Sequence, residues 1–360
     1  MSEPSIVDTC VRQYTIDYAK MAERVPEPWS EKLKIKSKVE DPAAGTLMAT
    51  LPWYHAYWNE DSPDYDRPAS GEYTNSEAYR SPEKVDEYLA EQGVDTALLT
   101  GHQIKFLPAV MNPEFTGVIA SAYNELLTDL WLDSSERLKG GIVVPMNNPD
   151  AAVEEIEKYA DHPDMVTVVF FGGTELPFGH RDYRRIFDAV VAADLPITAL
   201  TSENPVHRQV AMGVPKHYAT FNTNVAQNHY VNLISVLFQG LFDEYPDLDI
   251  VWGGEGMGWI LQPMWRSTRY YRNLEPQVPT ELEKEPHEYI ESNYVTTYPL
   301  PELDSGMTAR LVDMVGADNV MYASGYPHWN HDEVDDLPDD LDGDDREKLL
   351  SGNAKRVYDL

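Results

Sequence analysis

Four side chains with acid–base or charge chemistry stand where apolar runs give way to turns. Arg12 ends the first such run, His102 follows the second in Thr-Gly-His-Gln, Glu255 lies in Gly-Gly-Glu-Gly-Met-Gly-Trp, and His328 ends Ser-Gly-Tyr-Pro-His. A guanidinium group binds anions, whereas imidazole and carboxyl groups exchange protons. These four are the catalytic candidates, and together they predict a site for a small anionic substrate.

Each candidate also has a structural interpretation. Arg12 pairs with Glu255 across the site, or with an unrelated acidic loop of this acid-rich chain. Glu255 is a base or substrate anchor, or a carboxylate satisfied by backbone N–H groups of the next helix. His328 donates to a substrate or braces its own loop, and His102 is catalytic or an ordinary loop histidine. The sequence leaves these alternatives open.

Four further residues are predicted to contact the substrate. Tyr14 follows the first apolar run, and Trp259 and Tyr326 share the turns that carry the candidate glutamate and histidine. His55 lies in the aromatic stretch LPWYHAYW, where it lines the roof of a pocket or belongs to a surface excursion. His207, His217 and His229 have no partner four residues on for a helical metal pair and are interpreted as structural.

Alternating apolar strand patterns and helical patterns must position these side chains. Repeated strand–helix units imply a parallel sheet with helices outside, and eight units imply a (β/α)₈ TIM barrel. The runner-up, an open doubly wound sheet, is disfavoured because no glycine-rich phosphate turn follows the first strand. The predicted strands are residues 5–7, 94–100, 138–144, 166–171, 196–200, 249–252, 294–297 and 320–324. Among the helical patterns, residues 150–159 follow an Asn-Asn-Pro-Asp entry with capping groups and an early proline, and the apolar residues of 229–244 recur at helical spacing and predict one helix.

One stretch fits the barrel poorly. Residues 14–93 are rich in Trp, Tyr, Pro and Asp and show little periodicity. We interpret them as an insertion after the first strand that folds over the barrel mouth, with a loosely ordered surface excursion as the alternative. The whole chain, residues 1–360, is then one barrel domain.

The charge balance limits the partners. Lys and Arg number 28 against 61 Asp and Glu, a formal net charge of −33. Such an excess argues against binding to nucleic acid or to anionic membrane surfaces, because their phosphates are repelled. Acids are spread along the chain, which favours a halophilic protein, since at ~1 M salt the Debye length is only about 3 Å. A small-molecule substrate remains the predicted partner.

The single cysteine, Cys10, allows no internal disulfide bond, which suits a reducing compartment. The N-terminus lacks the basic and apolar regions of a signal peptide, and no apolar run approaches ~20 residues. These features predict a cytoplasmic protein. A homodimer, or pairing with a paralogue, is expected, with the aromatic-rich insertion as a contact surface.

Several blocks resemble the amidohydrolase-2 family, the relatives of aminocarboxymuconate-semialdehyde decarboxylase. They include Ile6-Val-Asp-Thr-Cys-Val-Arg12, Arg137-Leu-Lys-Gly-Gly-Ile-Val-Val-Pro145, Gly254-Glu-Gly-Met-Gly-Trp-Ile260 and the closing segment from Lys348 to Leu360. The blocks span nearly the whole chain in the family's order. The resemblance implies a metal-dependent hydrolase fold and a hydrolase or decarboxylase acting on a small carboxylated or cyclic substrate.

The family's zinc or other divalent metal is a separate question. Matching on Asp8 places Arg12 and Tyr14 at the family's His-x-His, and Leu200, Glu255 and Gly325 at its other ligand positions. Only the glutamate ligates readily, and a catalytic metal site needs about three protein ligands. The resemblance therefore predicts that most metal ligands are replaced, that no metal is held and that no cofactor is used.

Three interpretations follow. The chain is a decarboxylase or hydrolase that works without metal, a catalytically silent barrel that binds a small carboxylate or an active paralogue, or a metal enzyme that recruits other ligands such as His102, Glu255 and His328.

Overall fold

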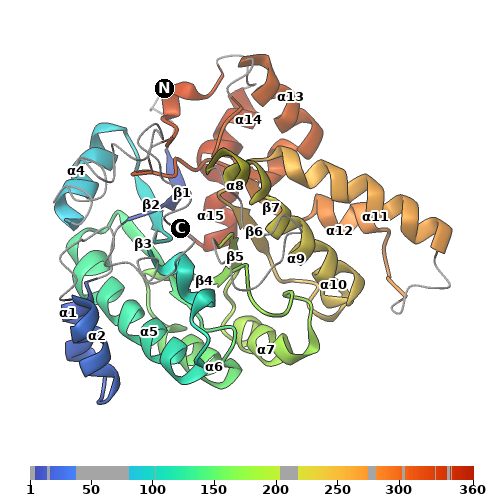
Figure 1. Cartoon of the computed structure of the whole chain (residues 1–360). Helices are drawn as coiled ribbons and strands as arrows, with labels where there is room; N and C mark the ends of the chain where they lie inside the picture. Colours follow the sequence, from blue (N-terminus) through green and yellow to red (C-terminus); the bar gives the residue numbers. More distant parts are fainter. Residues whose placement is uncertain are drawn as a thin grey trace.

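The structure is a computed structural model, and it describes residues 5–13, 17–37, 81–101, 103–202, 218–274, 281–301, 305–328, 330–338, 341 and 343–360. Eight parallel strands form one sheet in chain order, wrapped by helices (Figure 1). This confirms the predicted barrel. The strands are β1 Val7–Val11, β2 Thr96–Leu99, β3 Leu138–Val143, β4 Met165–Phe171, β5 Ile197–Leu200, β6 Ile250–Gly253, β7 Tyr294–Thr296 and β8 Val320–Met321.

Hydrogen bonds between β1 and the segment after β8 bring the two ends of the sheet together. The Thr9 N–H donates to the Tyr322 carbonyl at 3.0 Å, and the Gly325 N–H donates to the Cys10 carbonyl at 3.0 Å. The buried Asp8 carboxylate accepts from the Ser324 backbone N–H at 3.0 Å and from its hydroxyl group. The first strand is longer than predicted, because its pairing continues through Cys10 and Val11.

The described helices lie outside the sheet, and several of them bury one apolar face. They are α1 Tyr18–Arg24, α2 Trp29–Ser37, α4 Pro82–Glu91, α5 Pro113–Leu126, α6 Pro149–Tyr159, α7 Arg184–Ala192, α8 Tyr218–Asn224, α9 Gln227–Phe238, α10 Leu241–Glu244, α11 Leu261–Leu274, α12 Pro286–Glu291, α13 Ser305–Val315, α14 Gly343–Glu347 and α15 Asn353–Tyr358. The helix α6 begins as its sequence predicts, with Asn148 accepting from the Ala151 N–H at 3.3 Å. The run predicted as one helix over 229–244 is broken at Gly240, whose φ of 75° is left-handed.

Part of the predicted insertion packs on the barrel. The helices α1 and α2 bury Met21 and Leu33, and Trp29 stacks on Phe115 of α5 with ring centroids 4.9 Å apart. Residues 14–16 and 38–80 lie outside the described residues, so the lid over the mouth stays a prediction.

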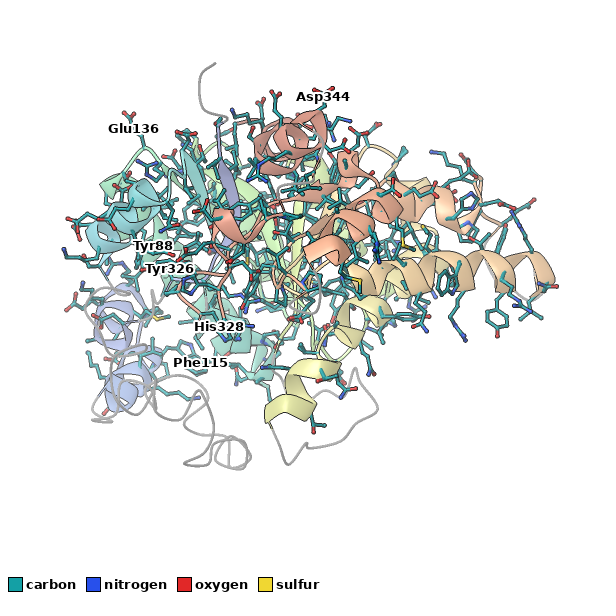
Figure 2. The ribbon with its side chains drawn as sticks, turned by 90° about the horizontal axis from the view of Figure 1, so that it is seen from above. Tyr88, Phe115, Glu136, Tyr326, His328 and Asp344 are labelled. Atoms are coloured by element: carbon teal, nitrogen blue, oxygen red, sulfur yellow. The ribbon has the colours of Figure 1, made fainter. Side chains whose placement is uncertain are left out.

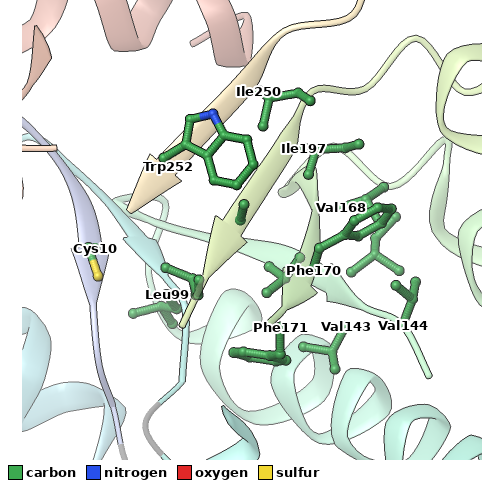
Figure 3. Close-up of a cluster of buried hydrophobic side chains, with 14 of the residues drawn as sticks. Cys10, Leu99, Val143, Val144, Val168, Phe170, Phe171, Ile197, Ile250 and Trp252 are labelled. Atoms are coloured by element: carbon green, nitrogen blue, oxygen red, sulfur yellow. The ribbon is translucent and has the colours of Figure 1, made fainter. Parts of the chain in front are cut away.

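The apolar core lies between the strands and their helices, and a second apolar cluster fills the base of the barrel. Figure 3 shows part of the first, with Phe170, Ile197 and Trp252 among the labelled side chains, and Cys10 is fully buried, as expected of a core residue. The second cluster joins one residue from each of six strands to three residues of α15: Val7, Leu98, Val166, Val251, Tyr294, Met321, Ala354, Val357 and Tyr358. Within the described residues, no helix combines the length and the apolar character that crossing a bilayer requires.

Candidate functional site

The C-terminal ends of the strands surround a cavity of about 80 Å³, at the end of the barrel where such folds place their active sites. Its lining is mostly polar and combines two cationic side chains with one carboxylate and one imidazole. The described residues that line it are Arg12, Lys105, Thr201, Asn222, Val225, Gly254, Glu255, Tyr298, Pro299, His328 and Asn330.

Arg12 follows β1 and reaches across the mouth. Its Nη2 donates to the Gly254 carbonyl at 3.2 Å, and its guanidinium carbon lies 4.8 Å from the centroid of the Tyr298 ring. Burial opposes the positive charge, but Tyr298, Cys10 and Glu255 nearby raise the pKa of Arg12 above its usual value. The guanidinium therefore stays charged and is fixed by a carbonyl and an aromatic face.

Glu255 follows β6 between two glycines in left-handed conformations, Gly254 with φ of 87° and Gly256 with φ of 68°. The Thr201 hydroxyl donates to its Oε1, and the Gly256 N–H donates to the Tyr298 carbonyl at 2.7 Å. No ion pair within 4.0 Å joins Glu255 to Arg12 in the described part of the chain, so the predicted bidentate contact is not formed. The Arg12 guanidinium instead donates to the Gly254 carbonyl, and the negative charge of Glu255 acts on it only through space.

His328 belongs to a small hydrogen-bonded cluster. Its Nδ1 lies 3.0 Å from the Tyr298 hydroxyl and also contacts Asn330 Oδ1, to which the Tyr298 hydroxyl donates at 2.7 Å. Burial and the positive charges of Arg12 and Lys105 hold the pKa of His328 well below its usual value. Burial raises the pKa of the Tyr298 hydroxyl group above its usual value, which also favours the uncharged form. Both groups are therefore uncharged at neutral pH, and the cluster supplies hydrogen bonds rather than charge.

The ring of Tyr298 also explains why glycine occupies position 325. The φ of Gly325 is 73°, and a Cβ built there meets ring carbons of Tyr298 at 2.3 and 2.5 Å. Any side chain at 325 would have to displace the ring. Tyr298 thus fills the space next to the strand end where the resemblance placed a metal-binding aspartate.

His229, on α9, lies behind the end of β6. It is buried, its Nε2 is 3.0 Å from the Gly253 carbonyl, and it packs between Trp252 and Trp259 at centroid distances of 5.5 and 5.2 Å. Burial, together with Arg12, lowers the pKa of His229 to about 4, against the partial opposition of the hydrogen bond to Gly253. The His229 ring is therefore neutral at pH 7, and its Nε2 donates to the Gly253 carbonyl. The next carbonyl along the chain, that of Gly254, accepts from Arg12.

A family model described as Amidohydrolase matches residues 78–360. The chain belongs to the amidohydrolase family. This confirms the resemblance drawn from the sequence blocks.

Curated relatives of the chain are gamma-resorcylate decarboxylases. The protein of Rhizobium sp. strain MTP-10005 is 27% identical over 264 residues, which cover 67% of this chain and 76% of the relative. The protein of Polaromonas sp. strain JS666 is 24% identical over 286 residues, 75% of this chain and 85% of the relative.

Solved structures show the same fold. The 5-carboxyvanillate decarboxylase of Sphingomonas paucimobilis has a TM-score of 0.70 at 18% identity and covers 99% of this chain and 100% of its own. The enzyme of Novosphingobium aromaticivorans, complexed with manganese and 4-hydroxy-3-methoxy-5-nitrobenzoic acid, has a TM-score of 0.73 at 18% identity, covering 99% and 97%.

The prediction of a cofactor-free site is contradicted by these structures. The Novosphingobium decarboxylase and the dihydroxybenzoic acid decarboxylase of Polaromonas were both solved with bound manganese. The described residues do not by themselves fit such an ion. They contain no group of three or more His, Cys, Asp or Glu side chains able to hold a metal. At two positions where the resemblance places ligands, the chain has Arg12 and Gly325, and the Tyr298 ring packs against Gly325. We therefore assign no step of the chemistry below to a metal.

The predicted site residues divide into three groups. Arg12, Glu255 and His328 line one cavity, and their roles there stay predictions. Trp259 packs on His229, and Tyr326 stacks on Tyr88 with ring centroids 3.7 Å apart, so neither belongs to the described lining of the cavity. Figure 2 shows Tyr326 and Tyr88 next to each other. Tyr14, His55 and His102 lie outside the described residues, and their roles stay predictions.

Sequence reasoning missed three groups at the cavity. Lys105 is buried at the start of the segment after β2, and Thr201 and Tyr298 follow β5 and β7. Lys105 and Thr201 each stand within six residues of a predicted strand end, which is the one signal that marks them. Nothing in the sequence indicates that the Tyr298 ring occupies the space that a side chain at position 325 would need.

Proposed function

We propose that this chain is a carboxy-lyase that releases CO₂ from a small aromatic carboxylate with a hydroxyl group on the ring. The relatives and neighbours reported above are decarboxylases of gamma-resorcylate, 5-carboxyvanillate or dihydroxybenzoate. The observation that carries the proposal is the charge of the cavity. In a chain of net charge −33, the mouth holds two cationic side chains, Arg12 and Lys105, facing one carboxylate.

The proposed reaction breaks the bond between the ring carbon and the carboxylate carbon. Before it breaks, the Glu255 carboxylate takes the proton of the ring hydroxyl group and delivers it to the ring carbon that bears the carboxylate. CO₂ then leaves, and the electron pair of the broken bond restores the aromatic ring and leaves the negative charge on the former hydroxyl oxygen. Negative charge therefore moves from the carboxylate to the ring during the reaction. Arg12 and Lys105 place fixed positive charges beside the hydroxyl oxygen of the substrate. They stabilise the negative charge more in the transition state than in the bound substrate.

Glu255 has the complementary role. As the carboxyl group of the lining, it is the group that exchanges the proton with the ring carbon, and Thr201 orients it through the hydroxyl hydrogen bond. Its charge beside the substrate carboxylate also favours the departure of CO₂, because it repels the group that is lost. His328 is uncharged and hydrogen-bonds to the ring hydroxyl.

The test is a CO₂-release assay with 2,6-dihydroxybenzoate, 5-carboxyvanillate and benzoate, with Mn²⁺ supplied because the neighbouring decarboxylases bind it. We expect release from at least one hydroxylated acid and none from benzoate. Arg12→Ala is expected to lower kcat/KM about 10²–10³-fold, the cost of removing one preorganised donor. Arg310→Ala, an exposed arginine on α13, is the matched control and leaves kcat/KM unchanged. Absence of CO₂ from every acid would overturn the proposal.

A further inference from the structure

The hydrogen bonds of the His328 ring determine which of its two nitrogens carries a proton. Its Nδ1 lies 3.0 Å from the Tyr298 hydroxyl oxygen and also contacts Asn330 Oδ1. An amide oxygen only accepts hydrogen bonds, and Asn330 Oδ1 already accepts from the Tyr298 hydroxyl group at 2.7 Å. The proton of that hydroxyl group is thereby committed to Asn330. Both oxygens beside Nδ1 are therefore acceptors, and Nδ1 is the nitrogen that donates.

The His328 ring carries only this one proton. Burial and the positive charges of Arg12 and Lys105 hold the pKa of His328 well below its usual value, so the ring is neutral at pH 7. A neutral imidazole with a proton on Nδ1 has none on Nε2, and that nitrogen only accepts hydrogen bonds. His328 thus brings an acceptor to a cavity whose two cationic side chains, Arg12 and Lys105, only donate.

The Tyr298 hydroxyl group is held in place from several sides. The side chain is 2% exposed, and the Arg12 guanidinium carbon lies 4.8 Å from the ring centroid. The ring fills the space beside Gly325, and the backbone carbonyl of Tyr298 accepts from the Gly256 N–H at 2.7 Å. The His328 N–H in turn donates to the Gly325 carbonyl at 3.0 Å. This packing fixes the hydroxyl oxygen next to Nδ1 of His328.

We propose that Tyr298 and Asn330 are positioning residues that hold His328 as the Nδ1–H tautomer, so that its Nε2 accepts a hydrogen bond from the bound ligand. That the donor is a ring hydroxyl group rests on the proposed function. In the proposed reaction one ring hydroxyl gives its proton to Glu255, and its oxygen ends with a negative charge that an unprotonated nitrogen does not stabilise. The hydroxyl group that donates to His328 is therefore a second one on the same ring.

The tautomer is measured without ligand or turnover, by long-range ¹H–¹⁵N correlation spectra of the full chain labelled with ¹⁵N in its histidine side chains. The chain has 10 histidines, and His328→Gln assigns the signals of His328 by their loss. At pH 7 we expect a protonated Nδ1 and an unprotonated Nε2. A protonated Nε2 in the wild-type chain would overturn the proposal.

Asn330→Leu tests what sets the tautomer. Without Asn330 Oδ1, the Tyr298 hydroxyl group is expected to donate to Nδ1 of His328, which moves the ring proton to Nε2. The matched control is Asn319→Leu, at the opposite end of β8, where the asparagine Nδ2 donates to the Asn293 carbonyl at 3.1 Å. We expect the His328 signals of this control to match the wild type. A tautomer that is the same in Asn330→Leu as in the wild type would contradict the assigned role of Asn330.

Titration calorimetry with two ligands tests the acceptor in the cavity. The Polaromonas inhibitor 2-nitroresorcinol has two hydroxyl groups, and 3-methoxy-2-nitrophenol replaces one of them by an ether oxygen that only accepts. The wild type and Asn319→Leu are expected to bind the diol at least about 10-fold more tightly. In Asn330→Leu that preference is expected to fall at least about threefold, because Nε2–H donates to the ether as well.

The ratio of the two Kd values is taken within each protein, so a general loss of folded protein does not move it. An equal ratio in Asn330→Leu and the wild type would overturn the proposal. A chain that releases no CO₂ from any acid would overturn the proposed function and not the tautomer, which the spectrum of His328 decides by itself.

Discussion

The two ends of the barrel are built from the same strands and are opposite in chemistry. At the base, Val7, Leu98 and Val251 pack against α15, and the space is filled by apolar side chains. At the mouth, the strands β1, β5 and β6 are followed by Arg12, Thr201 and Glu255, which line a polar cavity. The difference teaches that the barrel divides its side chains along the strand direction, with apolar packing at the base and the proposed reaction site at the mouth.

The largest effect on stability is expected at the base. Leu98 is 2% exposed, and Leu98→Ala leaves a cavity that the closed sheet cannot collapse around. We expect a loss of about 4 kcal/mol in the free energy of unfolding, measured by urea denaturation, with an unchanged kcat/KM per folded molecule. Val191→Ala, at a position 45% exposed on α7, is expected to cost less than about 0.5 kcal/mol. An equal cost for the two variants would remove the distinction between the two ends.

The buried side chain of His229, near the mouth, is expected to make the free energy of unfolding depend on pH. Its pKa is lowered to about 4 in the folded state, whereas an unfolded histidine titrates near ~6.5. Between these values the unfolded chain binds a proton that the folded chain does not, so stability falls as the pH falls from about 6.5 to about 4. The shift corresponds to roughly 3 kcal/mol.

We expect His229→Gln to lose that part of the acid sensitivity while keeping a donor for Gly253. The measurement is the free energy of unfolding at pH 7 and pH 4 in both proteins. The interpretation fails if the two proteins lose the same stability on acidification.

A pair of glycines with nearly the same backbone angle tests the packing at the mouth against open space near the base. Gly325 has φ of 73° and the Tyr298 ring within 2.3 Å of its would-be Cβ, whereas Gly93 has φ of 72° and meets only Ile6 at 3.8 Å. Both Gly→Ala variants carry the cost of a left-handed alanine, about 1 kcal/mol. Gly325→Ala is expected to cost about 2 kcal/mol more, because the ring must move. Equal melting temperatures for the two variants would show that the ring gives way freely.

Much of the fold could be predicted from the sequence, because the strands are fully buried apolar runs separated by helical patterns. The run from Met165 to Phe171 is an example. The residues at which individual strands and helices end could be predicted less well. The first strand extends to Val11 because it pairs with β2, and the helix predicted over 229–244 breaks where Gly240 adopts a left-handed conformation.

The candidate site could be predicted only in part. Arg12, Glu255 and His328 were identified because each follows a strand end, and parallel strand ends meet at one mouth. Their partners depend on side-chain directions that no local pattern encodes. The Arg12 contact to Gly254 and the Tyr298 ring at Gly325 are both of this kind. The cofactor prediction was wrong. It counted metal ligands only at the positions that match the family's pattern, whereas the similar decarboxylases were solved with bound manganese.

The central claim, that the mouth binds an aromatic anion through Arg12, is tested most directly by titration calorimetry with 2-nitroresorcinol. This compound is the inhibitor bound in the Polaromonas structure, and a nitro group replaces the carboxylate of 2,6-dihydroxybenzoate. A lost charge-assisted hydrogen bond is worth about 1.5–3 kcal/mol, so the Kd of Arg12→Ala is expected to rise at least about 10-fold while that of Leu98→Ala stays at the wild-type value. An unchanged Kd in Arg12→Ala would contradict the account.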